Sequence, residues 1–202
     1  MIRIGIICPS EIAFRRFLPA LQKANNKVEF TAIGIASPQE WFGDLSNVPV
    51  EQIEELQSRE CAKAQTFIAQ YGGKIVVGYE ALISSEDIDA VYLPLPPALH
   101  FHWAQKALEA GKHVFLEKPS TTCLKDTDEL IRIASKNGLA LHENYMFIYH
   151  NQLETIQNIV QSGEIGDVRL YRISFGFPLR QMNDFRYNKK LGGGALLDAG
   201  GY

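Results

Sequence analysis

The segment Glu117-Lys118-Pro119 carries the lysine best placed for chemistry. It closes the apolar run His113–Glu117, which predicts a buried strand, so Lys118 stands where a strand ends. An ammonium group beside a carbonyl can hydrogen-bond the reacting oxygen and stabilise the charge that develops on it. The alternative is an exposed loop lysine, which is the better interpretation of an isolated Glu-Lys-Pro segment.

Asp198 and Tyr202 form a second candidate pair near the end of the chain. They are four residues apart, so on a helix they would share one face. A phenol has an unperturbed pKa of about 10, and Tyr202 could donate a proton to a substrate oxygen if a nearby lysine lowered that pKa. The alternative is an aspartate on a helix surface and a tyrosine at the edge of a core.

The turn after the first apolar run is where a doubly wound fold binds a pyrophosphate, because the next helix begins there with free N–H groups. A G-x-G-x-x-G fingerprint would place glycine at positions 8 and 10, where this chain has Cys8 and Ser10. We expect Cys8 to hinder the turn, since a side chain is strained at positive φ. The alternative is a sealed turn without a ligand. The cofactor contacts predicted here are Cys8, Pro9, Ser10, Glu11, Ile12 and Ala13.

The end of the second apolar run usually holds the residue that binds the adenosine ribose, where an acid favours NAD and a nearby arginine favours NADP. Ser37 stands there with no acid directly beside it, and Arg59 follows an intervening segment. Arg59 could bind a 2′-phosphate, but a solvated position in the first turn of a helix explains it equally well. The choice between NAD and NADP therefore stays open.

Pro94, Leu95 and His100 follow the strand predicted at Ala90–Leu93. His100 could cap a helix or reach a cofactor, and the structural role is favoured. The other histidines do not have the spacing of a metal site, so no metal is expected.

Apolar strands alternate with helices over the first two thirds of the chain. This alternation predicts a parallel sheet covered on both faces, hence a doubly wound, Rossmann-like α/β fold. Residues 38–57 break the pattern and predict an insertion or long loop with a short acidic helical stretch. The predicted strands are Ile2–Ile7, Phe30–Ala36, Ile75–Val77, Ala90–Leu93, His113–Glu117 and Leu139–His142, and the main helices are Ile12–Ala24, Arg59–Tyr71, Tyr79–Ser84, His100–Ala110 and Thr121–Asn137.

The pattern changes after residue 143. A helix at Leu153–Gln161, a strand at Val168–Phe175 and a new apolar helix after Gly192-Gly193-Gly194 are expected. One strand and two helices cannot bury a sheet face. We therefore expect a dinucleotide-binding domain over residues 1–143 and the incomplete start of an α+β substrate and oligomerisation domain over residues 144–202.

Composition excludes several classes of protein. The net charge of -3 provides no broad basic surface for nucleic acid or an anionic membrane. No apolar run approaches the roughly 20 residues of a membrane span, and the apolar start predicts a strand instead of a signal peptide. The three cysteines are an odd number, which indicates reduced thiols and a cytoplasmic protein.

Taken in order, the motifs resemble the Gfo/Idh/MocA family of oxidoreductases over nearly the whole chain. Within that family, Asn144–Phe147 and Tyr202 are most similar to the nucleotide-sugar 3-ketoreductase branch, since many other members have histidine at the position of Tyr202. The segments that carry the resemblance are Arg15–Leu21, Val91–His100, Ala110–Val114, Glu117–Pro119, Gly163–Gly166 and Leu191–Asp198.

The resemblance implies an NAD(P)-dependent oxidoreductase that transfers a hydride between nicotinamide and a sugar or nucleotide-sugar carbonyl. It implies that Lys118 and Tyr202 flank that carbonyl, with Tyr202 as proton donor and Asp198 beside them. It also places Glu117, Lys118 and Pro119 at the nicotinamide, and Pro94, Leu95 and His100 along the cofactor cleft. Family members continue past this point with a large open sheet, so the chain is expected to be a fragment or a truncated product whose longer form is a homo-oligomer.

Two other functions stay open. One is a non-catalytic sensor or interaction protein of the same fold that binds a dinucleotide or a sugar, which the replacement at Cys8 favours. The other is a different reductase on this fold, similar to biliverdin reductase, which the glycine-rich segment before Asp198 disfavours.

Overall fold

The computed structural model describes residues 1–24 and 27–202. Six parallel strands form one sheet in the order β3-β2-β1-β4-β5-β6. The order reverses between β1 and β4, so the crevice of a doubly wound fold opens at the carboxyl ends of those two strands. The predicted Rossmann-like fold is confirmed. The strands are β1 Ile2–Ile7, β2 Val28–Ile35, β3 Lys74–Val77, β4 Ala90–Leu93, β5 His113–Glu117 and β6 Leu141–Asn144.

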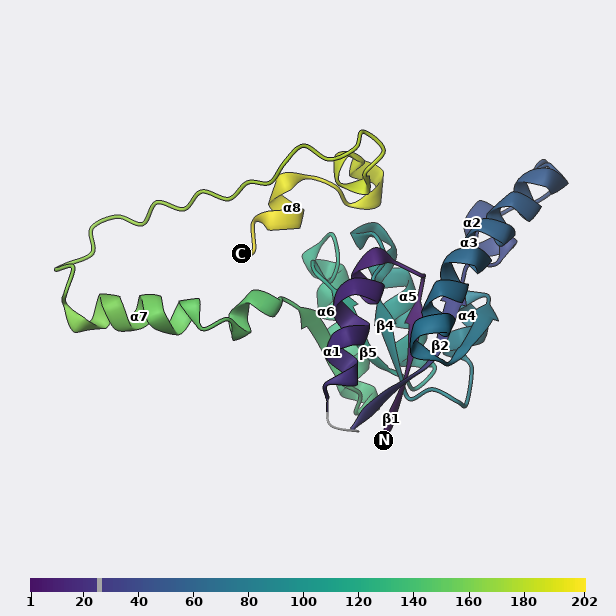
Figure 1. Ribbon diagram of the computed structural model, residues 1–202, viewed down its shortest axis with the longest axis horizontal. Coiled ribbons are helices and arrows are strands. Elements are labelled where there is room, and N and C mark those ends of the chain that lie inside the picture. The colour runs from purple at the N-terminus through teal and green to yellow at the C-terminus, as the bar shows by residue number, and fades with distance from the viewer. Residues whose placement is uncertain (25–26) are drawn as a thin grey trace.

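Helices cover both faces of the sheet (Figure 1). The first helix opens with a π-helical turn, η1, and continues as α1, within the range predicted for it. The helices are η1 Ala13–Phe17, α1 Leu18–Gln22, α2 Pro38–Phe42, α3 Val50–Tyr71, α4 Tyr79–Ile83, α5 Pro97–Glu109, α6 Leu124–Asn137, η2 Met146–Tyr149, α7 Gln152–Ser162, η3 Phe185–Tyr187, η4 Lys189–Leu191 and α8 Ala195–Ala199.

The core is divided by the sheet into two apolar clusters. Side chains of β1 alternate between them, with Ile4 and Ile6 in one cluster and Ile7 in the other. Because both faces are covered, the strands are apolar at nearly every position, which is why they could be recognised from the sequence.

The prediction that residues 38–57 form a long loop or insertion is wrong, because most of this segment is helical. Ser37 caps α2 through a capping box with Glu40, and only the stretch from Gly43 to Pro49 separates α2 from α3. The acidic stretch and the helix predicted to start at Arg59 are one continuous helix of 22 residues, because nothing between them breaks helical structure. Figure 1 shows α2 and the start of α3 projecting from the sheet.

The strand predicted at Val168–Phe175 is also not formed. This segment is extended, but it pairs with no strand of the residues that the structure describes. An isolated extended segment has no partner for its backbone N–H and C=O groups, so the β-forming residues alone do not make a strand. Its large side chains are exposed, for example Leu170 at 80% and Ile173 at 82%.

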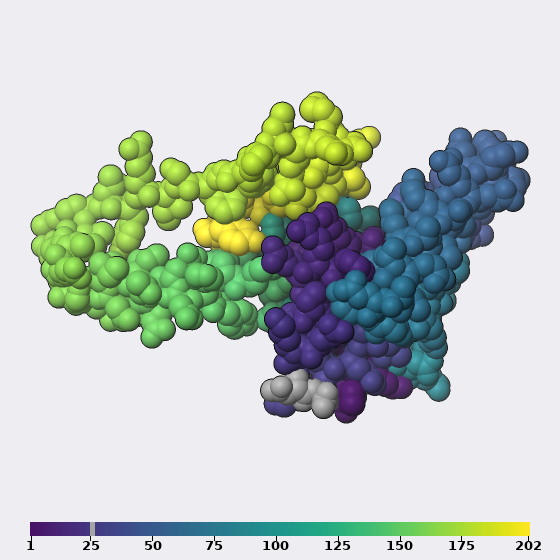
Figure 2. All heavy atoms as spheres, in the orientation of Figure 1, coloured from purple at the N-terminus to yellow at the C-terminus, as the bar shows by residue number. Residues whose placement is uncertain are grey.

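After this segment the chain returns to the domain. Figure 1 shows the last residues, α8 included, returning to the end of the sheet where the strands finish. In Figure 2 the last residues, in yellow, lie against the body of the domain. Among the described residues, none of the helices has the length and apolar character needed to cross a membrane.

Candidate active site

Lys118 and Asp198 meet at the carboxyl end of β5, although they are 80 residues apart in sequence. The Lys118 Nζ donates a hydrogen bond to Asp198 Oδ1 at 2.8 Å and another to the Asp198 backbone carbonyl. Each side chain is only 14% exposed. The pKa of Asp198 is lowered, because the hydrogen bond from Lys118 and the charges of Lys118 and Arg186 outweigh the raising effect of burial. The lysine is therefore held in place beside an ionised carboxylate, unlike a loop lysine in solvent.

Tyr202 completes the trio predicted as catalytic. Lys118 Nζ lies over its ring, 5.3 Å from the ring centroid. The rings of Tyr145 and Phe147 pack against Tyr202 at centroid distances of 5.7 and 5.0 Å, and Phe175 stacks on it at 5.6 Å. The aromatic residues after β6 thus fix the position of the phenol.

Two expectations about Tyr202 are wrong. It does not share a helix face with Asp198, because α8 ends at Ala199 before Gly200 and Gly201. Its pKa is raised, not lowered, since it is partly buried and faces the charge of Glu117. The ammonium of Lys118 is paired with Asp198 and lies over the ring face, so the phenol stays protonated.

The glycine-rich segment explains how Asp198 reaches Lys118. A Cβ on Gly192 would lie 2.9 Å from side-chain atoms of Pro97 and Thr122, and a Cβ on Gly193 would lie 2.5 Å from the Arg186 carbonyl oxygen. Only glycine permits this close approach to the start of α5 and to η3. The segment is thereby docked on the end of the sheet just before α8 begins.

Glu117 anchors the strand end that precedes Lys118. Its buried carboxylate accepts hydrogen bonds at Oε1 from the Tyr92 hydroxyl at 2.5 Å and from Asn144 Nδ2 at 2.7 Å. These bonds join β4, β5 and β6 at their carboxyl ends. The carboxylate also lines a groove of about 430 Å³ that Ile12 and Phe17 border from the first helix.

The predicted pyrophosphate turn borders a cavity of about 550 Å³. Cys8 has a φ of 78°, the strained conformation expected from the missing glycine. Ser10 Oγ accepts a hydrogen bond from Ala13 N at 3.2 Å, so the hydroxyl caps the helix. The cavity is lined by Cys8, Pro9, Ser10, Glu11, Phe14, Arg15, Lys63, Thr66 and Phe67.

At the end of β2, Ser37 is a helix cap and Arg59 is exposed. Arg59 stacks over the Trp41 ring, 5.6 Å from its centroid, and its Nε lies 3.2 Å from Glu60 Oε1. Glu40 is the acid nearest this strand end, but its carboxylate accepts backbone hydrogen bonds from Ser37, Tyr79 and Glu80. The guanidinium of Arg59 is about half exposed and is therefore more available to a ligand than the carboxylate of Glu40.

His100 is fully buried and holds two loops together. Its Nδ1 lies 2.9 Å from the Pro119 carbonyl oxygen and its Nε2 lies 2.8 Å from that of Leu95. Desolvation lowers its pKa. This geometry fits the structural alternative favoured from the sequence, and Pro94 and Leu95 are buried beside it. Contact of these residues with a cofactor stays a prediction.

Three cations near the site, Arg15, Lys63 and Arg186, were not among the site residues predicted from the sequence, and Arg15 and Lys63 both line the cavity at the pyrophosphate turn. Lys63 lies one helical turn before Phe67, which also lines this cavity, and this spacing could have indicated that Lys63 faces the turn. Arg186 bonds Asp198 Oδ2 through Nε at 3.0 Å, and no spacing in the sequence indicated this.

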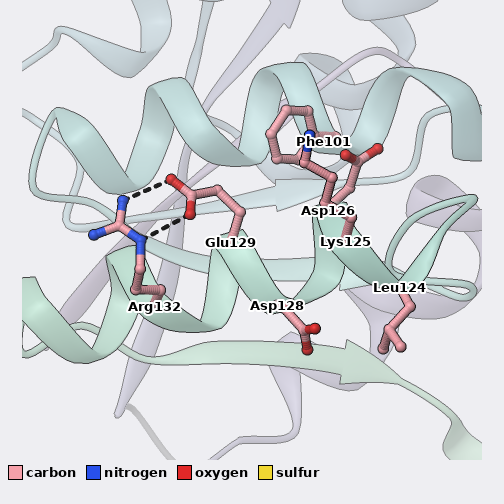
Figure 3. Close-up of a pocket in the computed structure, with 7 residues that line it drawn as sticks. All are labelled: Phe101, Leu124, Lys125, Asp126, Asp128, Glu129 and Arg132. Atoms are coloured by element: carbon pink, nitrogen blue, oxygen red, sulfur yellow. Dashed lines mark hydrogen bonds and ion pairs between the residues drawn. The ribbon is translucent and has the colours of Figure 1, made fainter.

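A third hollow, of about 590 Å³, lies on the outer surface of α5 and α6 and contains none of the predicted site residues (Figure 3). Its Arg132 is paired with Glu129. No cluster of three or more potential metal ligands occurs within residues 1–24 and 27–202.

Comparison with known proteins decides the family. Residues 2–145 match the oxidoreductase family with an NAD-binding Rossmann fold, GFO_IDH_MocA, and residues 153–202 match the GFO/IDH/MocA C-terminal domain. The chain belongs to the Gfo/Idh/MocA oxidoreductase family. The resemblance proposed from the ordered motifs is thus confirmed.

Relatives within the family include sugar-modifying enzymes. A dTDP-3,4-didehydro-2,6-dideoxy-alpha-D-glucose 3-reductase from Saccharopolyspora spinosa is 40% identical over 201 residues, covering 100% of this chain and 53% of that protein. A D-xylose 1-dehydrogenase (NADP(+)) from Haloferax volcanii is 34% identical over 80% of this chain and 51% of its own length.

Among solved structures, the 3-ketoreductase KijD10 from Actinomadura kijaniata, in complex with NADP and TDP-benzene, superimposes with a TM-score of 0.81. It is 40% identical, and the match covers 98% of this chain and 54% of that one. The chain thus spans about half the length of the curated relatives it matches.

Proposed function

We propose that the whole protein is an NADP-dependent ketoreductase that acts on a nucleotide-linked keto sugar. The observation that carries this proposal is the meeting of Lys118, Asp198 and Tyr202 at the carboxyl end of β5. In a doubly wound fold this end of the sheet faces the cofactor crevice. Membership of an oxidoreductase family and the names of the relatives support the same function.

The residues present fit a dinucleotide. The cavity at the pyrophosphate turn is bordered by Arg15 and Lys63, cations that suit a diphosphate and that pair here with Glu11 and Glu60. NADP is favoured over NAD because Arg59 is exposed at the end of β2, while the carboxylate of Glu40 is occupied by backbone N–H groups. When bound, the nicotinamide supplies or accepts the hydride.

The side chains of the trio divide the remaining chemistry. Lys118 donates a hydrogen bond to the sugar carbonyl oxygen and stabilises the charge that develops on it. Asp198 pairs with that lysine and orients its ammonium group. Tyr202 has a raised pKa and is therefore protonated at neutral pH, so it can donate the proton that the new hydroxyl needs.

The substrate class rests on relatives. The reductase from S. spinosa is named for a dTDP-linked sugar, and KijD10 was crystallised with TDP-benzene. Similarity to a xylose dehydrogenase keeps an unlinked sugar as the next substrate class to test.

The test uses the full encoded protein. NADPH consumption is followed with a dTDP-linked 3-keto sugar, and the product is identified by mass spectrometry. We expect turnover with the nucleotide-linked sugar, a preference for NADPH over NADH, and slower turnover with the free sugar. Binding of NADPH without turnover of any sugar would contradict the proposal.

A second function is favoured by one observation, the positive φ of Cys8 in the phosphate turn. A strained turn that approaches phosphate poorly would suit a sensor or interaction protein that binds its ligand without chemistry. Calorimetric titration with NADPH and with a dTDP-sugar separates the two functions, because a sensor binds at least one of them and turns over neither.

We further propose that the protein is cytoplasmic and that it forms a homo-oligomer. Three free cysteines support a reducing compartment. Helix α7 exposes Leu153, Ile156 and Ile159 along one face, the kind of apolar surface that marks an interface. Light scattering on the full encoded protein tests the oligomer.

A further inference from the structure

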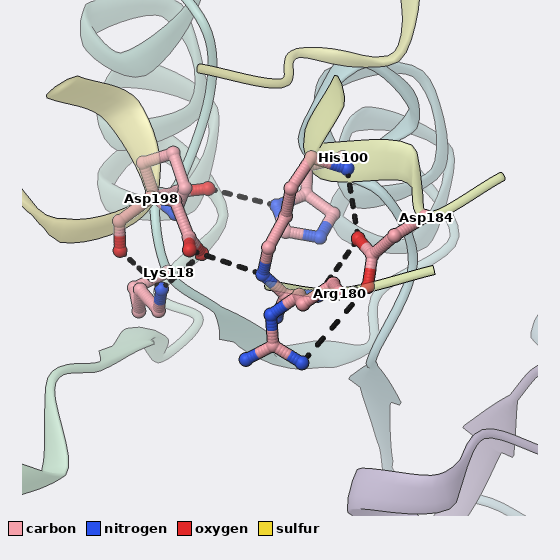
Figure 4. Close-up of polar contacts among 7 residues, drawn as sticks. His100, Lys118, Arg180, Asp184 and Asp198 are labelled. Carbon is pink, nitrogen blue, oxygen red and sulfur yellow. Dashed lines mark hydrogen bonds and ion pairs between the residues drawn. The ribbon is translucent and has the colours of Figure 1, made fainter. Parts of the chain in front are cut away.

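Five charged side chains of alternating sign lead from the sheet end toward solvent (Figure 4). Lys118 pairs with Asp198 at 2.8 Å, Asp198 with Arg186 at 3.0 Å, and Arg186 with Asp184 at 3.2 Å. Arg180 lies 3.9 Å from Asp184 at the outer end. The exposed fraction of the side chains rises from 14% at Lys118 and Asp198 to 40% at Arg180.

The carboxylate of Asp198 is shared between two cations. Its Oδ1 accepts from Lys118 Nζ, and its Oδ2 accepts from Arg186 Nε. A carboxylate held at both oxygens cannot turn about its terminal bond without losing a charge-assisted hydrogen bond. Arg186 thereby fixes the oxygen that Lys118 uses.

Arg186 is itself held in place by its backbone. Its N donates to Asp184 Oδ1 at 2.9 Å, and its carbonyl accepts from Gly194 N at 2.9 Å. Its guanidinium Nη1 also bonds both carboxylate oxygens of Asp184, at 3.2 and 3.4 Å. The same residue therefore anchors the start of α8 through its peptide and the Asp198 carboxylate through its side chain.

We infer that Arg186 is a positioning residue, which acts through Asp198 to hold the Lys118 ammonium against the reacting oxygen. This inference rests on the proposed function of Lys118. Arginine is required because its planar fork can bond two carboxylates at once, whereas an ammonium at that site provides one compact charge.

The test compares three variants of the full encoded protein. Arg186→Gln removes the bond to Asp198, and Arg186→Lys keeps the charge without the fork. Arg180→Gln is the matched control, since it removes one positive charge from the same row without touching Asp198. We expect kcat to fall about 10- to 100-fold in Arg186→Gln, because a small misplacement of a reacting group has effects of this size. Arg186→Lys should recover part of the loss.

A structural role alone would not give this pattern. The KM for NADPH should stay within about twofold, given that the cofactor contacts are elsewhere, and Arg180→Gln should match the wild type. Equal losses in Arg186→Gln and Arg180→Gln, or an unchanged kcat in Arg186→Gln, would overturn the inference.

A second measurement does not depend on turnover. The rate of reductive methylation of Lys118, read by mass spectrometry, should rise severalfold in Arg186→Gln and not in Arg180→Gln, because the Asp198 carboxylate that holds the ammonium is no longer fixed at Oδ2. An unchanged rate contradicts the inference even if the wild type shows no sugar turnover. A wild type without turnover contradicts only the proposed function.

Discussion

Lys118 and Asp198 form an ion pair in which each side chain is 14% exposed. Burying such a pair is costly, and its net contribution to stability is often near zero. Stability therefore does not explain why two charges from distant parts of the chain are brought together at a sheet end. The proposed catalytic role explains it better, since an ammonium group can stabilise an oxyanion while the neighbouring phenol supplies a proton.

At the end of β2, the exposed Arg59 is proposed to bind the 2′-phosphate of NADP. We expect Arg59→Ala to weaken NADPH binding about 10- to 100-fold, the loss of one or two hydrogen bonds to a charged group. NADH binding should change little, which makes NADH the internal control. Fluorescence titration measures the Kd of each cofactor and hence the preference for NADPH over NADH. An equal loss of affinity for both cofactors would show that Arg59 acts on the fold instead.

Cys8 is strained at positive φ, and desolvation raises the pKa of its thiol to about 11. We expect Cys8→Gly to tighten NADPH binding severalfold, because glycine removes a conformational cost of about 1 kcal/mol at this turn and clears space beside the phosphates. Calorimetric titration measures the change. Weaker binding in Cys8→Gly would show that the thiol packs usefully in the turn.

The residues of the site differ in how far the sequence could reveal them. The place of Lys118 after an apolar strand and the four-residue spacing of Asp198 and Tyr202 made these residues candidates, but only the family resemblance joined them into one site. Arg186 and the raised pKa of Tyr202 could not be predicted, since both depend on contacts between segments whose relative position no local pattern determines.

At the scale of elements, the glycine-rich segment before α8 is the part that brings the trio together. Gly193 passes so close to the Arg186 backbone that a Cβ would lie 2.5 Å from its carbonyl oxygen. The sequence predicts only that a helix starts after this segment. Its docking role is visible only in the structure.

Gly193→Ala tests this docking. We expect a loss of activity of at least about tenfold with the sheet domain intact, because relieving the clash moves α8 and with it Asp198. Circular dichroism and NADPH titration should match the wild type. Gly176→Ala is the control, since a Cβ there meets nothing within 4 Å.

The pair Arg3–Asp89 joins β1 to the turn before β4 through three hydrogen bonds at 2.7 to 3.0 Å. The hydrogen bonds and charge of Arg3 hold the pKa of Asp89 well below its usual range. A carboxylate with a depressed folded-state pKa stabilises the fold above its unfolded pKa of about 3.9, and this contribution is lost as pH falls.

We therefore expect Asp89→Asn to lower Tm at pH 7 and to flatten the decline of Tm below about pH 5. Both side chains are 37% exposed, so the effect should be modest. Thermal melts across pH measure it. A Tm curve that keeps its full acid slope in Asp89→Asn would show that other carboxylates cause the decline.

Strands and helices of the first domain were predictable because apolar periodicity and stop signals agree there. The prediction ended one segment at Gln57 and began a helix at Arg59, because residues 38–57 have a mixed composition. The structure shows that this composition still allows α3 to run unbroken. The strand predicted at Val168–Phe175 is absent for a different reason, because a strand needs a neighbouring strand to bond its backbone N–H and C=O groups. The residue pattern was β-forming, but the partner is not among the described residues.

Over the whole molecule, the sheet domain and the segment that follows it differ in how well their apolar side chains are buried. The sheet domain has its own core on both faces, whereas the segment from α7 to the extended stretch leaves large apolar side chains exposed. The last residues nevertheless return to the sheet end and deliver Asp198 and Tyr202. The proposed chemistry thus depends on a long-range contact between the sheet domain and the glycine-rich segment that docks on it.

The most direct test of this account is the rate of hydride transfer in Lys118→Met. A single turnover of the full encoded protein with NADPH and a dTDP-linked 3-keto sugar is followed by stopped-flow absorbance. We expect the rate to fall about 10²- to 10³-fold, the usual effect of removing one oxyanion donor, while the Kd for NADPH changes little. Full-speed hydride transfer in Lys118→Met would contradict the account.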